Sequence, residues 1–182
     1  SPLRPRSPYA VSKLAQDFLG LQYHLAYGLH IVRVRPFNHI GPGQGPGFVA
    51  ADFARQVAEA EAGQREPTIR VGNLEAARDF TDVRDVVNAY RLLARQGQAG
   101  EVYNVASGRA VKISALLELM LACSRVPIKV IQDESRMRPS DTPLVYGDYG
   151  KLHACTGWQP TIPLEVTVHD VLEYWRAQLR KG

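Results

Sequence analysis

The stretch SPYAVSK at residues 7–13 opens a long segment with helical periodicity. Its serine is a candidate N-cap, its proline suits the first helical position, and Gly28 is a candidate stop. Between these signals the apolar residues recur at helical spacing, at Val11, Leu14, Phe18, Leu21 and Leu25. We therefore expect one long helix with a single buried face, on which Tyr9 and Lys13 stand one turn apart.

The spacing of Tyr9 and Lys13 brings two side chains to one face of a helix, about 5–6 Å apart at Cβ. The positive charge of a lysine near a phenol favours the phenolate, which makes the tyrosine a usable general acid or base. The same YxxxK spacing also occurs on helices that have no catalytic role. The pair alone therefore leaves both interpretations open.

Beyond this helix, strand-like and helix-like segments alternate. Strands are expected at 30–35, 68–71, around Phe80, at 100–107 and at 128–131. Helices are expected at 48–62, after Phe80, and at 113–123, 149–156 and 164–179. The segments 36–47 and 133–143 are expected to be loops. This alternation is typical of α/β layering with some parallel strands, yet two candidate buried strands are too few for a doubly wound sheet.

The composition restricts the classes of function. The chain has 182 residues, 45% hydrophobic and 22% charged, which is typical of a globular domain with a real core. Its net charge of +4 comes without any Lys/Arg block, so an anionic small ligand is expected rather than nucleic acid. No membrane span and no signal-peptide core are visible. Cys123 and Cys155 form no CxxC pair, so reduced thiols in a cytoplasmic protein are expected.

Several motifs follow one another from residue 1 to about residue 180. They are SPYAVSK at 7–13, RPFNHIGPGQ at 35–44, DFARQVAEAEAG at 52–63, RDFTDVRDVVNAY at 78–90, EVYNVASG at 101–108, RMRPSDTP at 136–143 and TGWQP at 156–160. In this order they resemble the extended short-chain dehydrogenase/reductase family of nucleotide-sugar epimerases, dehydratases and reductases. The resemblance implies an α/β fold, the carboxy-terminal part of a Rossmann-type unit, with the amino-terminal βαβ cofactor half absent.

The resemblance also implies a division of the chain. Residues 1–40 and 79–108 would supply the last Rossmann elements. Residues 41–78 and 109–182 would form most of a smaller, mixed α/β substrate-binding lobe.

In this family the YxxxK tyrosine exchanges a proton with the sugar oxygen, and the lysine holds the nicotinamide ribose. The resemblance gives these roles to Tyr9 and Lys13, with NADP or NAD as the cofactor, whose glycine-rich loop is not in this chain. It also places Pro36, Asn38 and His39 on the cofactor side of the site. An asparagine in a loop also makes local turns, and His39 could equally be a packing residue.

The same resemblance assigns a pocket for a nucleotide-diphosphate sugar. Its predicted members are Asn38, Phe48, Val49, Arg55, Arg78, Arg138 and Asp141. Arginine suits a diphosphate because its planar guanidinium gives bidentate, permanently charged contacts. Within this set, Arg138 would reach the phosphate and Asp141 the nucleoside ribose. Each arginine taken singly could equally be a solvated surface residue.

Within the family, the sequences NHIGPGQ and RPSDTP are most similar to those of reductases. These reductases use NAD(P)H on GDP-4-keto-6-deoxy-mannose to form GDP-rhamnose. A 4-epimerase, a 4,6-dehydratase, a decarboxylase and a non-catalytic sugar-nucleotide-binding module are the alternatives. The resemblance also implies a homodimer through the YxxxK helix and an amino-terminal half as a further partner. Without that half, the chain should expose apolar surface and open strand edges.

Asp79, Asp82 and Asp85 stand close together in RDFTDVRD and could suggest a metal. We expect instead that two of them cap and charge the start of the following helix, where the helix dipole stabilises acids. No metal site is predicted.

Overall fold

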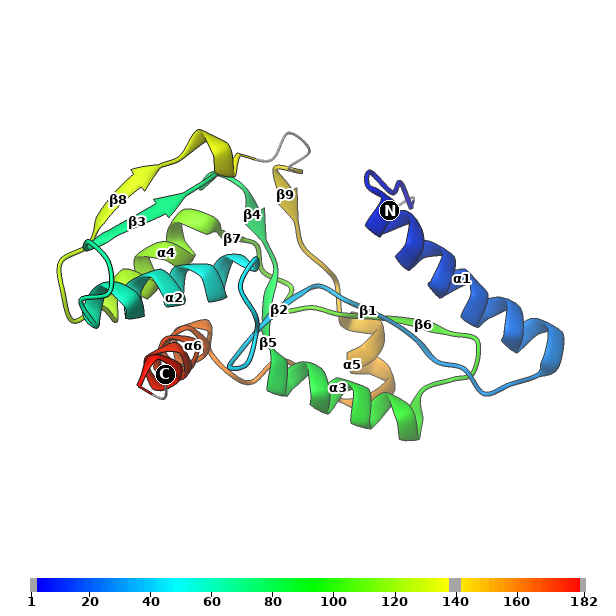
Figure 1. Cartoon of the computed structure of the whole chain (residues 1–182). Coiled ribbons are helices and arrows are strands. Elements are labelled where there is room, and N and C mark those ends of the chain that lie inside the picture. Colours follow the sequence, from blue (N-terminus) through cyan, green and yellow to red (C-terminus); the bar gives the residue numbers. More distant parts are fainter. Residues whose placement is uncertain (1–2, 138–141, 181–182) are drawn as a thin grey trace.

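The computed structural model of the chain describes residues 3–137 and 142–180. Two regions lie side by side, with paired strands running between them (Figure 1). The first region holds a strand pair between helices and carries the N-terminal helix. The second region, called the lobe below, packs three helices against another strand pair.

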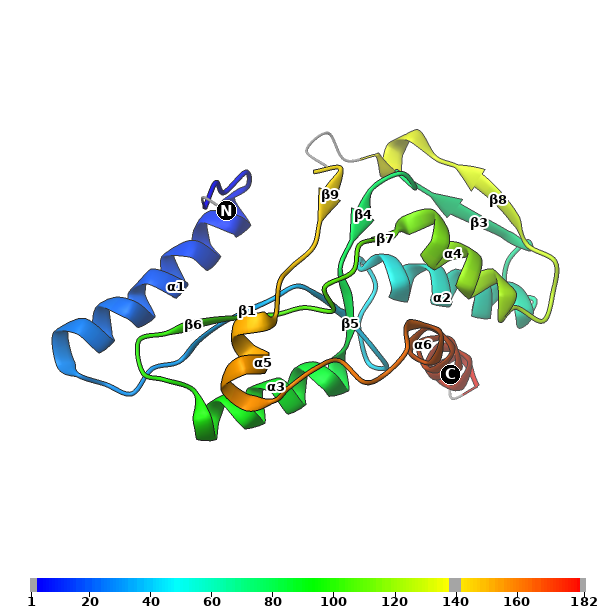
Figure 2. The ribbon, with the colours of Figure 1, turned by 180° about the vertical axis from the view of Figure 1, so that it is seen from behind.

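A parallel strand pair forms the centre of the first region. β1 (Arg33–Pro36) pairs with β6 (Val102–Val105). α1 (Pro8–Tyr27) lies along one side of this pair, and α3 (Val83–Gln96) and α5 (Gly150–Thr156) lie along the other (Figures 1 and 2). Parallel strands between two layers of helices confirm the predicted α/β class.

A bent segment connects the two regions. After Phe37 the chain forms β2 (Asn38–Ile40), which pairs in parallel with β5 (Phe80–Asp82) instead of with β6. The prediction of an irregular loop over 36–47 is therefore wrong at its beginning. The backbone groups of this segment find a partner strand that lies far away in the sequence, and no local signal announces that pairing.

The lobe places a strand pair over three helices (Figure 1). β3 (Thr68–Val71) pairs in parallel with β8 (Lys129–Gln132). The helices are α2 (Val49–Glu61), α4 (Ile113–Ala122) and α6 (Leu164–Leu179). Their bounds agree with the predicted helices to within a residue, because apolar periodicity and the buried face coincide in each of them.

A small three-stranded sheet lies where the lobe meets the first region. β4 (Ala77–Arg78) pairs antiparallel with β7 (Val111–Lys112) and parallel with β9 (Leu144–Val145). A 3₁₀ turn, η1 (Glu134–Arg136), follows β8 within the segment predicted to be a loop. Strands of two residues carry too little sequence periodicity to be predicted.

Each of the two regions has its own hydrophobic core. The lobe core includes Phe53, Val57, Ile69, Leu116, Met120, Val168 and Leu172. The core of the first region includes Val86, Leu93, Tyr103, Val105, Leu152 and Trp158. Helix α5 packs with β6 in the first region, while α6 packs within the lobe. The predicted division into Rossmann elements and a substrate-binding lobe stays a prediction.

Helix α1 differs from the predicted amphipathic helix. Ser7 Oγ accepts a backbone N–H of the first turn, and Gly28 ends the helix with φ at 66°, so both ends are as predicted. The expected buried face is wrong, because no residue of α1 is buried. Val11, Phe18 and Leu25 are 53%, 49% and 73% exposed. The described chain therefore leaves an apolar helix face uncovered.

Candidate functional site

The cap at Ser7 places Tyr9 and Lys13 in the first turns of α1. The Lys13 ammonium lies 5.7 Å from the centroid of the Tyr9 ring, and it also donates a hydrogen bond to Gln16 Oε1 at 3.3 Å. Tyr9 is 71% exposed, so its phenol is open to a ligand. The helix has thus brought a cation and a phenol to one face, as the spacing predicts.

Tyr9 and Lys13 line a hollow of about 860 Å³ between α1 and β1, called the tyrosine hollow below. Pro36 and His39 line the same hollow, so these four predicted residues meet at one place. Its β1 wall carries Arg33 and Arg35, whose guanidinium groups donate to Asp17 at 3.2 and 2.6 Å.

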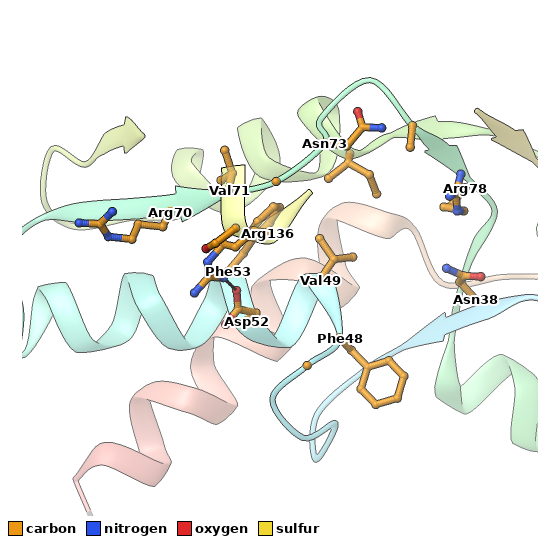
Figure 3. Close-up of a pocket in the computed structure, with 15 residues that line it drawn as sticks. Asn38, Phe48, Val49, Asp52, Phe53, Arg70, Val71, Asn73, Arg78 and Arg136 are labelled. Atoms are coloured by element: carbon orange, nitrogen blue, oxygen red, sulfur yellow. Dashed lines mark hydrogen bonds and ion pairs between the residues drawn. The ribbon is translucent and has the colours of Figure 1, made fainter. Parts of the chain in front are cut away.

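A second cavity, called the arginine pocket below, has a volume of about 470 Å³ and lies between α2, β3 and η1 (Figure 3). It brings together the predicted substrate residues Asn38, Phe48, Val49 and Arg78. It is also lined by residues that the sequence did not single out, among them Asp52, Arg70 and Arg136. A cavity of this size and with several guanidinium groups suits a phosphorylated ligand.

Strand β2 connects the two cavities. Successive residues of a strand point to opposite sides, and Asn38 lines the arginine pocket while His39 lines the tyrosine hollow. His39 Nδ1 lies 3.2 Å from the carbonyl oxygen of Phe37. Asn38 was predicted to contact both cofactor and substrate, and this placement favours the substrate side.

The position of Arg78 is fixed by its neighbour in sequence. Asp79 is 1% exposed, and its carboxylate accepts hydrogen bonds from the N–H and the hydroxyl of Ser107, both at 2.7 Å. It also accepts from Gly108 N–H at 3.0 Å and Gly147 N–H at 3.2 Å. Asp79 thereby anchors β4 to two loops, and Arg78 faces the pocket from this anchored strand (Figure 3).

Among the described residues, one predicted substrate residue is not brought to the pocket. Arg55 is absent from its lining, because its guanidinium donates to Glu59 at 2.8 Å and to Asp52 at 3.4 Å along α2. Arg138 and Asp141 lie outside the described residues.

The polar pocket residues that were not predicted come from segments far apart in the sequence. Arg136 Nη1 donates to Asp52 Oδ2 at 2.6 Å, across 84 residues of sequence. Asp52 follows Val49 by about one helical turn, and this spacing could have indicated that both face the same cavity. Arg70 stands in a short strand without a motif. Arg136 opens the RMRPSDTP motif, but only Arg138 and Asp141 of that motif were predicted to be pocket residues.

The end of the pocket near η1 carries both signs of charge. Asp133 Oδ2 lies 3.9 Å from Arg70 Nη1 and 3.9 Å from Arg136 Nε. Hydrogen bonds from Ser135 hold the pKa of the Asp133 carboxyl below its ordinary value, and the two arginines lower it further. This acid is therefore ionised at neutral pH.

The aspartates of the RDFTDVRD motif serve structural roles. Asp82 caps α3 by accepting from Arg84 N–H at 2.8 Å, and Asp85 lies in the first turn, as predicted for two of the three. Asp85 also accepts from Thr161 N–H and Ile162 N–H, each at 3.0 Å. Among residues 3–137 and 142–180, no group of three acidic, histidine or cysteine side chains could hold a metal ion.

Cys123 and Cys155 are both free and partly buried. None of the described helices is long and apolar enough to span a bilayer.

Parallel strands between helix layers, a YxxxK pair at one cavity and an arginine-lined pocket beside it define an α/β unit of the extended short-chain dehydrogenase/reductase type. This is the class that the motifs predicted. The chain belongs to the GDP-mannose 4,6 dehydratase family, whose model matches residues 1–171.

The chain is also similar to individual proteins and to solved structures. GDP-6-deoxy-D-mannose reductase of Pseudomonas aeruginosa is 43% identical over 177 residues, which cover 97% of this chain and 58% of the reductase. The structure of RMD from P. aeruginosa complexed with NADPH matches with a TM-score of 0.90 and 42% identity, over 96% of this chain and 58% of that one. UDP-glucose 4-epimerase of Thermotoga maritima, solved with UDP-glucose, gives a TM-score of 0.87 at 27% identity, over 97% and 55% of the two chains.

The chain thus spans 58% of the length of the P. aeruginosa reductase, and it matches the carboxy-terminal part of that protein. This confirms the predicted fold class, a carboxy-terminal part of an extended Rossmann-type unit.

Proposed function

We propose that the complete protein reduces the 4-keto group of GDP-4-keto-6-deoxy-mannose with NADPH or NADH to form GDP-rhamnose. The observation that carries this proposal is the 43% identity to a GDP-6-deoxy-D-mannose reductase over 97% of the chain. Within that matched region Tyr9 and Lys13 line one hollow, beside a pocket lined by arginines.

The residues of the tyrosine hollow fit the nicotinamide end of such a cofactor. The hollow offers the Lys13 ammonium and the Tyr9 phenol beside apolar walls at Ile31, Val34 and Pro36. Apolar walls with a few polar groups are typical of cofactor sites. A bound nicotinamide would supply the reducing equivalent for the carbonyl carbon.

Tyr9 then acts as the general acid. Its O–H donates a proton to the carbonyl oxygen of the sugar as negative charge develops there, which turns the ketone into an alcohol. The Lys13 ammonium, 5.7 Å from the Tyr9 ring centroid, stabilises the phenolate that is left. Lys13 also binds a ribose hydroxyl of the cofactor, and His39 and Pro36 line the cofactor side.

The arginine pocket binds the nucleotide part of the substrate. Asn38 contacts the sugar or the adjoining phosphate, because β2 carries it between the two cavities. Arg78 contacts the diphosphate, and Phe48 and Val49 frame the pocket at the start of α2. Arg138 and Asp141 are proposed to reach the phosphate and the nucleoside ribose. Arg55 is left out of this assignment because its guanidinium is held by Glu59.

Two partners complete the proposal. An amino-terminal cofactor-binding half, in the same protein, is supported by the 58% coverage of the reductase and by the uncovered apolar face of α1. A homodimer through α1 would cover the rest of that face. Size-exclusion chromatography and binding of a hydrophobic dye to the chain by itself test this. A compact monomer that binds no dye would contradict it.

Replacement of Tyr9 by phenylalanine in the complete protein tests the reaction. Removal of a general acid lowers the rate by about 10²–10⁴-fold, so Tyr9→Phe should lose turnover to this extent while GDP binding is unchanged. Tyr27→Phe is a matched control, since Tyr27 stands on the same helix and is 69% exposed, away from the hollow. Unchanged turnover in Tyr9→Phe would remove Tyr9 from the mechanism.

Product analysis separates the reductase from the alternatives. With GDP-4-keto-6-deoxy-mannose and NADPH, the reductase consumes the cofactor and forms GDP-rhamnose in equal amounts. An epimerase or a dehydratase consumes no NADPH over complete cycles. A binding module takes up GDP and shows no turnover.

A further inference from the structure

The arginine pocket has two ends with different chemistry (Figure 3). Asn38 and Arg78 stand at one end, and Asp52, Arg70 and Arg136 stand at the other. Asn38 is followed by His39, which lines the tyrosine hollow. The end at Asn38 therefore faces the reacting sugar, and the Asp52 end lies farthest from the chemistry.

This orientation determines which part of a nucleotide sugar meets each end. The sugar, the diphosphate, the ribose and the base follow one another along the ligand. With the sugar at the tyrosine hollow and the diphosphate near Arg78, the base reaches the Asp52 end. The step rests on the function proposed above, because it takes a nucleotide sugar as the ligand.

Asp52 is held in place by a buried side chain. Gln56 is fully buried, and its amide donates to Asp52 Oδ2 at 3.0 Å and to the carbonyl oxygen of Arg70 at 3.3 Å. Its own carbonyl accepts from Arg70 N–H at 2.9 Å. Gln56 thus ties α2 to β3 and fixes the orientation of the Asp52 carboxylate relative to the pocket.

The Asp52 carboxylate keeps acceptor capacity at Oδ1. Oδ2 accepts from Arg136 at 2.6 Å and from Gln56 at 3.0 Å, whereas Oδ1 has only a 3.4 Å contact with Arg55 within the described residues. A carboxylate oxygen offers about two acceptor sites. Arg136 is 38% exposed and has five N–H donors, of which Asp52 takes one.

A carboxylate paired with a guanidinium presents an acceptor next to a donor. Guanine has the complementary edge, with the O6 acceptor followed by the N1–H and N2–H donors. Hypoxanthine lacks the N2 amine, and uracil has one N–H between two carbonyls. Both keep a carbonyl next to an N–H, so a carboxylate oxygen that meets the N2 amine discriminates guanine from both.

We propose that Asp52 and Arg136 read the guanine base of the substrate. Asp52 accepts from the guanine N2–H through Oδ1, and Arg136 donates to O6. Gln56 acts as a positioning residue that holds Asp52 without touching the base.

Calorimetric titration of the complete protein with GDP, IDP and UDP tests this inference. GDP should bind about tenfold more tightly than IDP, since one hydrogen bond to a charged acceptor separates them, and UDP should bind more weakly still. Equal affinity for GDP and IDP would overturn the assignment, and this comparison needs no variant.

Two variants sharpen the test. Asp52→Asn should weaken GDP by about tenfold to a hundredfold and reduce the preference for GDP over IDP to nearly one. Arg136→Gln should weaken GDP and IDP equally, because both carry O6. An unchanged GDP to IDP ratio in Asp52→Asn would overturn the proposal.

Glu59→Gln is the matched control, because Glu59 lies on the same helix, pairs with Arg55 and Arg65, and does not line the pocket. Thermal unfolding of each variant shows whether a loss of affinity reflects a loss of structure. Base preference is measured without turnover, so a protein that selects GDP through Asp52 but reduces no 4-keto sugar would overturn only the proposed function. A protein that reduces the sugar but ignores the N2 amine would overturn only this inference.

Discussion

Helices α1 and α2 show how the same kind of sequence pattern leads to different degrees of burial. Both have apolar residues at helical spacing, yet α2 buries Phe53 and Val57 at 3% and 0% exposure while α1 buries no residue. The difference lies in the surroundings of the two helices. α2 packs against α4, α6 and β3, whereas α1 has β1 on one side and its apolar face open.

The comparison shows that periodicity predicts a helix and the direction of its apolar face, but not whether that face is covered. Most of the stability of a helix in a protein comes from packing of that face. The lobe is therefore expected to be the stable part of this chain, and α1 to depend on partners.

The largest expected effect comes from truncating the same type of side chain in the lobe and on α1. Leu116 on α4 is 0% exposed, and Leu116→Ala should destabilise the chain by about 2–5 kcal/mol. Leu25 on α1 is 73% exposed, and Leu25→Ala should change the stability by less than about 0.5 kcal/mol. Urea unfolding followed by circular dichroism measures both. A loss at Leu25 as large as that at Leu116 would contradict this prediction and would support the proposed homodimer through α1.

An intermediate effect is expected at the contact between the lobe and α3. Thr167 of α6 donates to Asp82 at 2.8 Å, and Arg84 pairs with both Asp82 and Asp170. Burial favours the neutral form of Asp82, but the hydrogen bonds from Arg84 and Thr167 outweigh it and hold its pKa below the ordinary value. Asp82→Asn should therefore cost roughly 1.5–3 kcal/mol at neutral pH.

The lowered pKa also gives this effect a pH dependence. The stabilisation by Asp82 is fully present above the unfolded pKa of about 3.9 and is lost as the pH falls through the lower folded pKa. The difference in unfolding free energy between wild type and Asp82→Asn should be constant from pH 7 to about pH 5 and shrink below about pH 4. A difference that grows on acidification would contradict the assigned direction.

The smallest effect is expected at the cap of α1. Ser7 Oγ accepts from Ala10 N–H at 3.1 Å, and Ser7→Ala should cost about 0.5–2 kcal/mol of helix stability. Because α1 has little packing to hold it, the loss should appear as lower helicity in circular dichroism while the unfolding midpoint of the lobe stays unchanged. Ser12→Ala is a suitable control, since Ser12 donates to the Tyr9 carbonyl within the helix and caps nothing. A shift of the lobe midpoint would show that α1 and the lobe unfold together.

Much of the fold followed from local sequence. The helix at Ser7 to Gly28, β3 at 68–71 and α6 at 164–179 agree with the predicted segments, because caps, β-branched runs and apolar periodicity act over a few residues. The strands β2, β4, β7 and β9 were missed. Each has two or three residues and exists through pairing with a segment distant in sequence.

The candidate site likewise contains residues that the sequence indicated and residues that it did not. The motifs indicated Tyr9, Lys13, Asn38 and Arg78, and the structure places each of them at a cavity. The sequence did not indicate Arg136, which reaches Asp52 from 84 residues away. Nor did it show that Asp79 anchors two loops, since its partners lie 28 to 68 residues along the chain.

The sequence by itself determined the helix that sets a lysine one turn from a tyrosine, since this depends only on 3.6 residues per turn and a serine cap. Only the tertiary structure decided that Asn38 and His39 face two different cavities, and that a carboxylate and a guanidinium meet at the far end of one of them. Such meetings depend on how strands pair and helices pack across long separations, and those contacts leave no periodic trace in the sequence around each residue.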